Sequence, residues 1–216
     1  MTSNNLVEYG NIVRGNLNLS WKTNKPPIYF QIHKNSPVIT KPENPESNDF
    51  SGNTTVSSGT TIITNIDGIA SNQSFWLEVG DNRTISPDYP DLKNVVKETS
   101  ITFCYPVFYG SIVKGEENNL TSESLRALEN KVLKTDKNGN YKINSGTITD
   151  NKITVIAFPA DISAFKNPTF TVGGFSSSYP TKEIDYISDT ENPYTKKYII
   201  YYGTNIGLGE DTIVVS

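Results

Sequence analysis

Short stretches in which apolar and polar residues alternate constrain this chain more than any other feature of its sequence. Leu17, Leu19 and Trp21 point to one side of such a stretch and the polar residues between them to the other, which predicts a β-strand with one buried face. Comparable runs occur at residues 28–32, 60–64, 74–79 and 97–105. Proline, glycine, asparagine and serine separate them, so the first half of the chain is predicted to be a series of short antiparallel strands.

Residues 1–105 are therefore expected to form one antiparallel β-sandwich of the immunoglobulin or fibronectin type. Residues 33–59 are rich in proline, asparagine and serine, and we expect a long loop there with a short strand near Val38. The disulfide of true immunoglobulin domains is absent, because Cys104 is the one cysteine of the chain. The two tryptophans are expected to be core aromatics and not ligand contacts.

Residues 106–216 are predicted to form a second antiparallel β domain, which makes the protein mainly β. Residues 153–158 (ITVIAF) are apolar on both faces, which indicates a central strand, and the turn residues Asp150 and Asn151 before it suggest a hairpin. Near the C-terminus two apolar runs flank residues 203–209 (GTNIGLG). We expect a final hairpin there, whose glycines serve bends and close backbone approach.

One amphipathic helix is predicted near residues 121–134. Thr121 is placed to cap it, and Leu120 and Leu125 are spaced to form a hydrophobic staple. Three apolar residues at helical spacing would face a sheet: Leu125, Leu128 and Val132. Residues 137–140 (KNGN) are expected to end the helix.

Residues with catalytic or metal-binding chemistry are few and scattered. His33 is the only histidine, and no cysteine or carboxylate pair lies near it in the sequence, so we interpret it as a solvated residue at a strand end. Cys104 lies in an apolar run and is expected to be a small buried hydrophobe. The sequence predicts no catalytic residue, no cofactor and no metal, and therefore a protein that is not an enzyme. A depolymerase is the enzymatic alternative.

Two acidic patterns bear a partial likeness to calcium sites. Asp185, Asp189 and Glu191 could bind calcium in a loop, but their spacing fits no ligand template. Residues 136–140 (DKNGN) resemble the start of a calcium loop and lack its terminal glutamate, so a turn is the preferred interpretation. The glycine clusters of the C-terminal third do not precede predicted helices, which argues against phosphate binding.

Composition restricts the partners of the chain. The formal net charge is −4 over 216 residues, which gives no basic field for nucleic acid. No stretch approaches the roughly 20 apolar residues of a membrane span. The first residues have neither the basic nor the apolar region of a signal peptide, so we expect synthesis in the cytoplasm.

Several short segments follow in order over residues 100–216: residues 105–110 (YPVFYG), the predicted helix near 121–134, residues 156–159 (IAFP), 170–175 (FTVGGF), 197–202 (KYIIYY) and 205–209 (NIGLG). In these segments the second half of the chain resembles the structural proteins of tailed bacteriophages, of the tail, baseplate or fibre type. Immunoglobulin-like modules often precede such a domain. One segment departs from the family pattern: an Asn-x-x-Gly-Tyr motif is replaced here by residues 190–194 (TENPY).

The resemblance implies a virion structural protein that assembles with other virion proteins, as a homo-oligomer or in multiple copies. A head-decoration or head-fibre protein is the nearest alternative. A carbohydrate-binding adhesion module is the second class, in which exposed tyrosines of residues 176–202 would contact a glycan. A host-surface glycan or protein is thus an additional expected partner, and the family supplies no catalytic residue.

Overall fold

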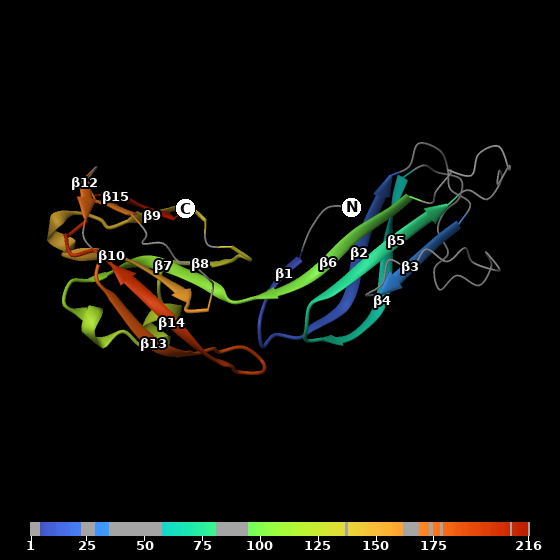
Figure 1. Ribbon diagram of the computed structural model, residues 1–216, viewed down its shortest axis with the longest axis horizontal. Helices are drawn as coiled ribbons and strands as arrows, with labels where there is room; N and C mark the ends of the chain where they lie inside the picture. Colours follow the sequence, from blue (N-terminus) through green and yellow to red (C-terminus); the bar gives the residue numbers. More distant parts are fainter. Residues whose placement is uncertain are drawn as a thin grey trace. The chain divides into compact units, whose positions relative to one another are not determined.

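The computed structural model describes residues 5–22, 29–34, 58–80, 95–136, 138–161, 169–172, 175–177, 179–207 and 209–215. The chain divides into two compact units (Figure 1). Unit 1 comprises Met1–Val7 and Ile12–Phe103, and unit 2 comprises Glu8–Asn11 and Cys104–Ser216. Both units consist mainly of β-strands, as the alternating sequence pattern predicts.

Unit 1 is built from six described strands: β1 (Asn5–Glu8), β2 (Val13–Lys22), β3 (Tyr29–Lys34), β4 (Ser58–Ile69), β5 (Gln73–Gly80) and β6 (Val95–Cys104). Four form a sheet in the order β1-β6-β5-β3, and β2 pairs with β4. Ile101 and Phe103 are buried, as the alternation in β6 predicts. The expected short strand near Val38 lies outside the described residues, as do the side chains of Trp21 and Trp76.

The described residues of unit 2 form two sheets and three short helices. The five-stranded sheet has the order β13-β14-β10-β7-β8 and the four-stranded sheet the order β12-β11-β15-β9. The strands are β7 (Pro106–Val113), β8 (Asn130–Leu133), β9 (Gly139–Asn144), β10 (Lys152–Pro159), β11 (Thr169–Val172), β12 (Phe175–Ser177), β13 (Thr181–Ile187), β14 (Thr195–Tyr202) and β15 (Glu210–Val215). The helices are η2 (Glu116–Asn119), α1 (Ser122–Arg126) and η3 (Ile148–Asp150).

Apolar side chains cover both faces of the five-stranded sheet. One core cluster lies between the two sheets: Val107, Tyr141, Ile143, Ile156, Phe158, Tyr201, Ile213 and Val215. The other lies on the opposite face, where the residues around α1 contribute to it: Phe108, Ile112, Leu120, Leu125, Leu128, Ile153, Val155, Ala157, Tyr186, Tyr198 and Ile200. Strand β10 supplies alternate residues to the two clusters.

The prediction that residues 153–158 form a central strand is confirmed, because β10 lies between β7 and β14. The predicted hairpin before it is wrong. Residues 148–150 form η3, and Asn151 closes it with a left-handed backbone (φ 50°). Strand β10 pairs on both sides with strands distant in sequence. The turn residues Asp150 and Asn151 therefore change the direction of the chain, but the segments on either side of them do not pair with each other.

The predicted helix near residues 121–134 begins as expected and ends much earlier. Thr121 accepts a hydrogen bond from the Ser124 amide in a capping box, and Leu120 and Leu125 are buried in one cluster. The helix ends at Arg126, and residues 130–133 form β8 at the edge of β7. Val132 packs against the cluster between the sheets, on the opposite face from Leu125, so the expected single stripe does not exist.

The short helix α1 protects one edge of the five-stranded sheet. Ser122 Oγ accepts from the Ile187 amide at 2.8 Å and donates to the Asp185 carbonyl at 3.4 Å. Arg126 donates to the Ile187 carbonyl. These side chains take the places that a neighbouring strand would fill, which blocks edge-to-edge pairing along this part of β13.

The predicted C-terminal hairpin is also wrong, because β14 and β15 belong to different sheets. Residues 203–209 connect the two sheets, and Gly203 and Gly207 each donate a backbone hydrogen bond at 2.8 Å to β10. A β-carbon on Gly207 would overlap Ser145 and the Asp211 carboxylate, whereas Gly209 has φ +82° and open space around it. Both glycines are therefore structurally required, for close approach and for a left-handed backbone respectively.

Helices long and apolar enough to cross a membrane are absent from the described ranges.

Candidate functional site

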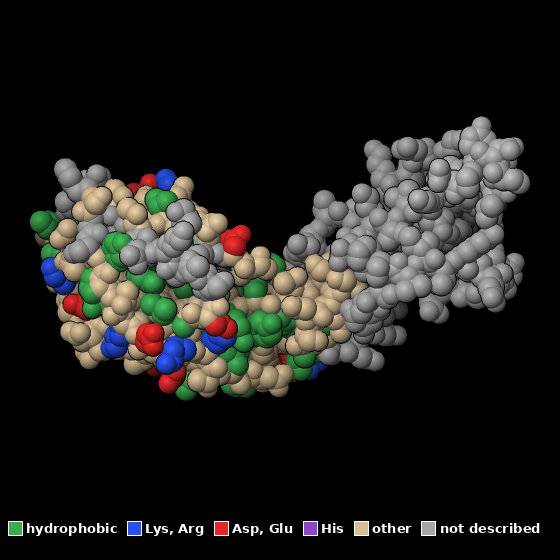
Figure 2. Space-filling model, in the orientation of Figure 1, with side chains coloured by type: hydrophobic (Ala, Val, Ile, Leu, Met, Phe, Trp, Pro, Cys, Tyr) green, Lys and Arg blue, Asp and Glu red, His purple; other side chains and the backbone are tan. Residues whose placement is uncertain are grey.

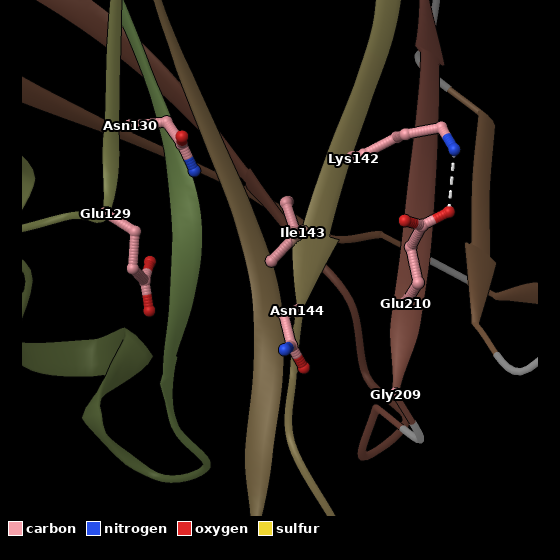
Figure 3. Close-up of a pocket in the computed structure, with 7 residues that line it drawn as sticks. All are labelled: Glu129, Asn130, Lys142, Ile143, Asn144, Gly209 and Glu210. Carbon is pink, nitrogen blue, oxygen red and sulfur yellow. Dashed lines mark hydrogen bonds and ion pairs between the residues drawn. The ribbon is translucent and has the colours of Figure 1, made fainter.

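A surface pocket of about 430 Å³ opens where β8, β9 and β15 begin or end in unit 2. It is lined by Glu129, Asn130, Lys142, Ile143, Asn144, Gly209 and Glu210. In Figure 3, Glu129 and Asn130 lie on one side and the Lys142–Glu210 pair on the other, with Ile143 and Asn144 between them. The two edge strands β8 and β9 thus face this pocket from different sheets.

Glu129 is held in place by the backbone of β7. Its carboxylate accepts from the Ser111 amide and from Ser111 Oγ, each at 2.8 Å. A β-carbon at position 110 would overlap this carboxylate, so Gly110 makes the arrangement possible. Both oxygens of Glu129 are therefore engaged with the protein, and the carboxylate marks a fixed negative wall of the pocket.

The opposite wall is an ion pair between neighbouring strands. Lys142 Nζ lies 2.7 Å from Glu210 Oε1, and the two side chains are 64% and 62% exposed. Asn144 pairs in register with Glu210, and its Oδ1 accepts from the Gly146 amide at 2.9 Å. The Asn144 amide group is thereby oriented with its N–H donors unused by any described residue.

Asn130 opens β8 and is half-buried at the pocket. Its backbone is in register with Tyr109, while its side-chain amide has no hydrogen-bond partner among the described residues. Gly209 completes the rim, and its amide donates to the Gly146 carbonyl at 2.7 Å. The pocket therefore combines two amides with open hydrogen-bonding capacity, two carboxylates and one ammonium group.

A second polar cluster in unit 2 surrounds the buried carboxylate of Glu8, which is 5% exposed. Glu8 Oε1 accepts from Tyr194 Oη at 3.0 Å, and Glu8 Oε2 lies 2.5 Å from Lys131 Nζ. Next to Glu8, the Tyr9 ring stacks on Tyr105 with centroids 4.4 Å apart. These contacts satisfy the charge and fix residues 8–11 to unit 2, which makes the cluster structural.

Gly10 extends this attachment. Its carbonyl accepts from the Asn192 amide at 2.7 Å, and its φ of +83° and its close approach to Thr190 exclude a β-carbon. The segment 190–194, which departs from the bacteriophage pattern, therefore contacts residues 8–11.

Burial dominates the titration of the tyrosines. Burial, with the Glu8 carboxylate as the second cause, raises the pKa of Tyr186 to about 12. Burial, with Asp136 as the second cause, raises the pKa of Tyr141 to about 12. Burial also strongly raises the pKa values of Tyr194 and Tyr198. All four hydroxyls stay neutral under physiological conditions, so none is activated as a base.

Among the side chains that the structure describes, the sequence candidates for chemistry are not brought together. Cys104 is buried, and burial together with Glu8 raises the pKa of its thiol, which makes it a weak nucleophile. Asp189 lies 3.8 Å from Arg126, and no group of three potential metal ligands occurs in the part of the chain that the structure describes. His33 lies on β3, and its side chain is outside the described residues.

The tyrosines of residues 176–202 do not form the exposed glycan surface that the sequence suggested. Tyr186, Tyr198 and Tyr201 are buried, and the remaining ones are half-buried: Tyr179, Tyr194 and Tyr202. Tyr198 Oη donates to the Pro106 carbonyl at 2.8 Å inside the core. Their aromatic area stabilises the sheet from within, so they are poor candidates for receptor contacts.

Sequence reasoning missed the pocket, because its residues come from segments whose pattern predicts other structures. The helical spacing predicts Glu129 and Asn130 inside a helix, and Asn144 and Glu210 belong to strands that pair across a long sequence separation. The one signal of the pocket in the sequence is a pair of glycines within the bacteriophage-like segments, Gly110 and Gly209.

On the visible face of unit 2 in Figure 2, positive and negative side chains alternate without a field of one sign.

Comparison of the chain with protein-family models, with curated proteins and with solved structures gave no match in any of the three.

Proposed function

We propose that the protein is a structural component of a tailed-bacteriophage virion, part of the tail, baseplate or fibre, that assembles through contacts with other virion proteins in multiple copies. The proposal rests on the resemblance of residues 100–216 to such proteins. Unit 1 is proposed to be an immunoglobulin-like module, on the strength of its short antiparallel strands in two sheets. The virion is then the place where the protein acts.

The observation that carries the proposal is the place of the matching segments in the fold. Residues 105–110, 156–159 and 197–202 overlap β7, β10 and β14, which are neighbours in one sheet. Residues 205–209 belong to the connection that is hydrogen-bonded to the same sheet. Segments far apart in sequence thus belong to one folding unit. This supports a similarity between whole domains and argues against a chance match of short apolar segments.

Many of the described residues in the matching segments are buried, which also favours a structural role over an enzymatic one. The recurring tyrosines and glycines of these segments pack the core or permit close approach, as Tyr198 and Gly207 do. Two carboxylates of unit 2 are bound to neighbouring side chains or backbone: Glu8 to Lys131, and Glu129 to Ser111. A chain of this kind supplies a rigid surface for assembly.

The test is the location of the chain in intact particles. Antibodies against the purified protein, coupled to gold, should label tailed particles at one repeated position in electron micrographs, and its peptides should appear in gradient-purified particles. Particles produced with an early stop codon in the gene are the control and should lose the label. Label on the capsid would favour the head-decoration or head-fibre alternative, and absence from every particle would refute the proposal.

A further inference from the structure

We propose that the pocket between β8, β9 and β15 binds a neutral sugar ring through its adjacent hydroxyl groups. This site goes beyond the assembly role, and it requires only the geometry of unit 2. A particle location for the chain would neither establish it nor exclude it.

The size of the pocket suits a small polar ligand. Its volume of about 430 Å³ lies within the roughly 300–1,000 Å³ typical of small-molecule sites. Ile143 is 2% exposed and packs in the core between the two sheets, so its side chain lies beneath the pocket and a ligand would contact the polar residues around it. The surrounding walls are polar, as a ligand covered with hydroxyl groups requires.

The hydrogen-bonding groups match hydroxyls. A sugar hydroxyl donates one hydrogen bond and accepts others, and a side-chain amide does both. The Asn130 amide is without a partner in the described protein, and the Asn144 oxygen already accepts from the Gly146 amide. Asn144 therefore offers donors and Asn130 offers both kinds of group, while Glu210 adds carboxylate acceptors at the opposite wall.

The charges select against anions. Glu129, Glu210 and Lys142 give the pocket a net charge of −1, and Lys142 is already paired with Glu210 at 2.7 Å. A phosphate or a uronic acid would find no free cation among these lining residues and would face two carboxylates. A metal ion is disfavoured as well, because the Glu129 oxygens are both engaged by Ser111.

Two of the polar side chains, Glu129 and Asn144, are fixed before any ligand arrives. Ser111 orients Glu129, Gly146 orients Asn144, and the Gly209 amide is bound to the Gly146 carbonyl at 2.7 Å. A preorganised site loses little conformational freedom on binding, which favours a ligand as small as one or two sugar rings.

The experiment is a nuclear magnetic resonance titration of the full ¹⁵N-labelled chain with glucose, galactose, mannose, N-acetylglucosamine and, as the anionic comparison, glucuronate. We expect at least one neutral sugar to shift the side-chain amide resonances of Asn130 and Asn144, with a dissociation constant on the order of 1 mM. Glucuronate should bind more weakly than glucose. The matching disaccharides should show whether a chain of sugars, as on a cell surface, binds more tightly than one ring.

Two variants and a control assign the site. Asn130→Ala removes the unpartnered amide, and Asn144→Asp keeps the oxygen that accepts from Gly146 and removes the N–H donors; each should weaken binding about tenfold. Asn118→Ala, on the exposed helix η2, should leave binding unchanged. Unshifted Asn130 and Asn144 resonances with every sugar, tighter binding of glucuronate, or affinity unaffected in both variants would overturn the proposal.

Discussion

Replacing Gly207 by alanine tests the tightest contact in the connection between the two sheets of unit 2. A β-carbon at this position would overlap Ser145 and the Asp211 carboxylate. Ser145 and Asp211 are 0% and 1% exposed, and Ser145 Oγ donates to Asp211 Oδ2. The alanine therefore has to displace a buried hydrogen bond to a charged group, and the backbone of β9 and β15 leaves it little room.

The expected loss follows from two contributions. Overpacking of a filled interior costs about 1–3 kcal/mol, and weakening a hydrogen bond to a buried charge costs about 1.5–3 kcal/mol. Because one displacement causes both, we expect a total of about 3 kcal/mol. With a urea dependence of about 2 kcal/mol per molar for a domain of this size, the unfolding midpoint of unit 2 should fall by about 1.5 M.

The assay has to follow unit 2 alone. Both tryptophans belong to unit 1 by sequence, whereas Tyr141, Tyr186 and Tyr198 are buried in unit 2. Near-ultraviolet circular dichroism of the tyrosines is therefore the suitable signal, since tryptophan fluorescence reports mainly on the other unit. Urea titrations of wild type and variant should differ in midpoint and agree in slope.

Gly209→Ala is the matched control, because Gly209 has φ +82° and no atom lies within 4 Å of the place that a β-carbon would take. It should cost about 1 kcal/mol from the left-handed backbone alone, and Gly209→Asn should cost less. Adding Ser145→Gly to Gly207→Ala should restore about 1 kcal/mol, as expected for coupled neighbours. A Gly207→Ala midpoint equal to that of wild type or of Gly209→Ala would refute the close-approach reasoning.

Three further predictions concern charge, titration and reactivity. Glu8→Ala should destabilise unit 2 by about 2 kcal/mol in the same urea assay, because Tyr194 and Lys131 lose their buried partner. Glu210→Ala is the control: it breaks an exposed ion pair with Lys142 and should cost about 0.5 kcal/mol or less. The pKa of Tyr141 and of Tyr186 is raised to about 12 from 10.0, so the stability from these neutral hydroxyls is complete below about pH 10 and is lost as the pH rises toward 12; a tyrosinate absorbance titration that follows the unfolded pKa in the native protein would contradict this. Cys104 should react with a thiol reagent at least about tenfold more slowly in the native protein than in urea, because it is buried and its pKa is raised; equal rates would show that it is accessible.

The sequence pattern was informative wherever a local property decides the structure. The alternation of Ile153, Val155 and Ala157 against Ile156 and Phe158 placed β10 in the centre of its sheet, since a strand apolar on both faces is buried on both. The N-terminal cap of α1 could be predicted from the sequence for the same reason, because Thr121 and the residues that follow it interact within one turn.

Pairing partners were decided by tertiary structure. Leu125, Leu128 and Val132 have helical spacing, but β7 has an edge that residues 130–133 fill by backbone hydrogen bonds, and this pairing ends the helix early. The two apolar runs at the C-terminus, which form β14 and β15, have the composition of a hairpin. They do not pair with each other, because they belong to different sheets and β15 lies between β9 and β11.

The candidate site depends on tertiary structure even more. Glu129, Asn144 and Glu210 are ordinary polar residues in the sequence, and they line one pocket only because β8, β9 and β15 meet there. What the sequence determined by itself is the β-rich character, the central strand and the need for glycine at a few tight positions, because alternation, capping and backbone conformation act over a few residues. The order of strands in the sheets, the length of α1 and the pocket were decided by contacts between residues far apart in the chain, which leave no periodic signal in the sequence.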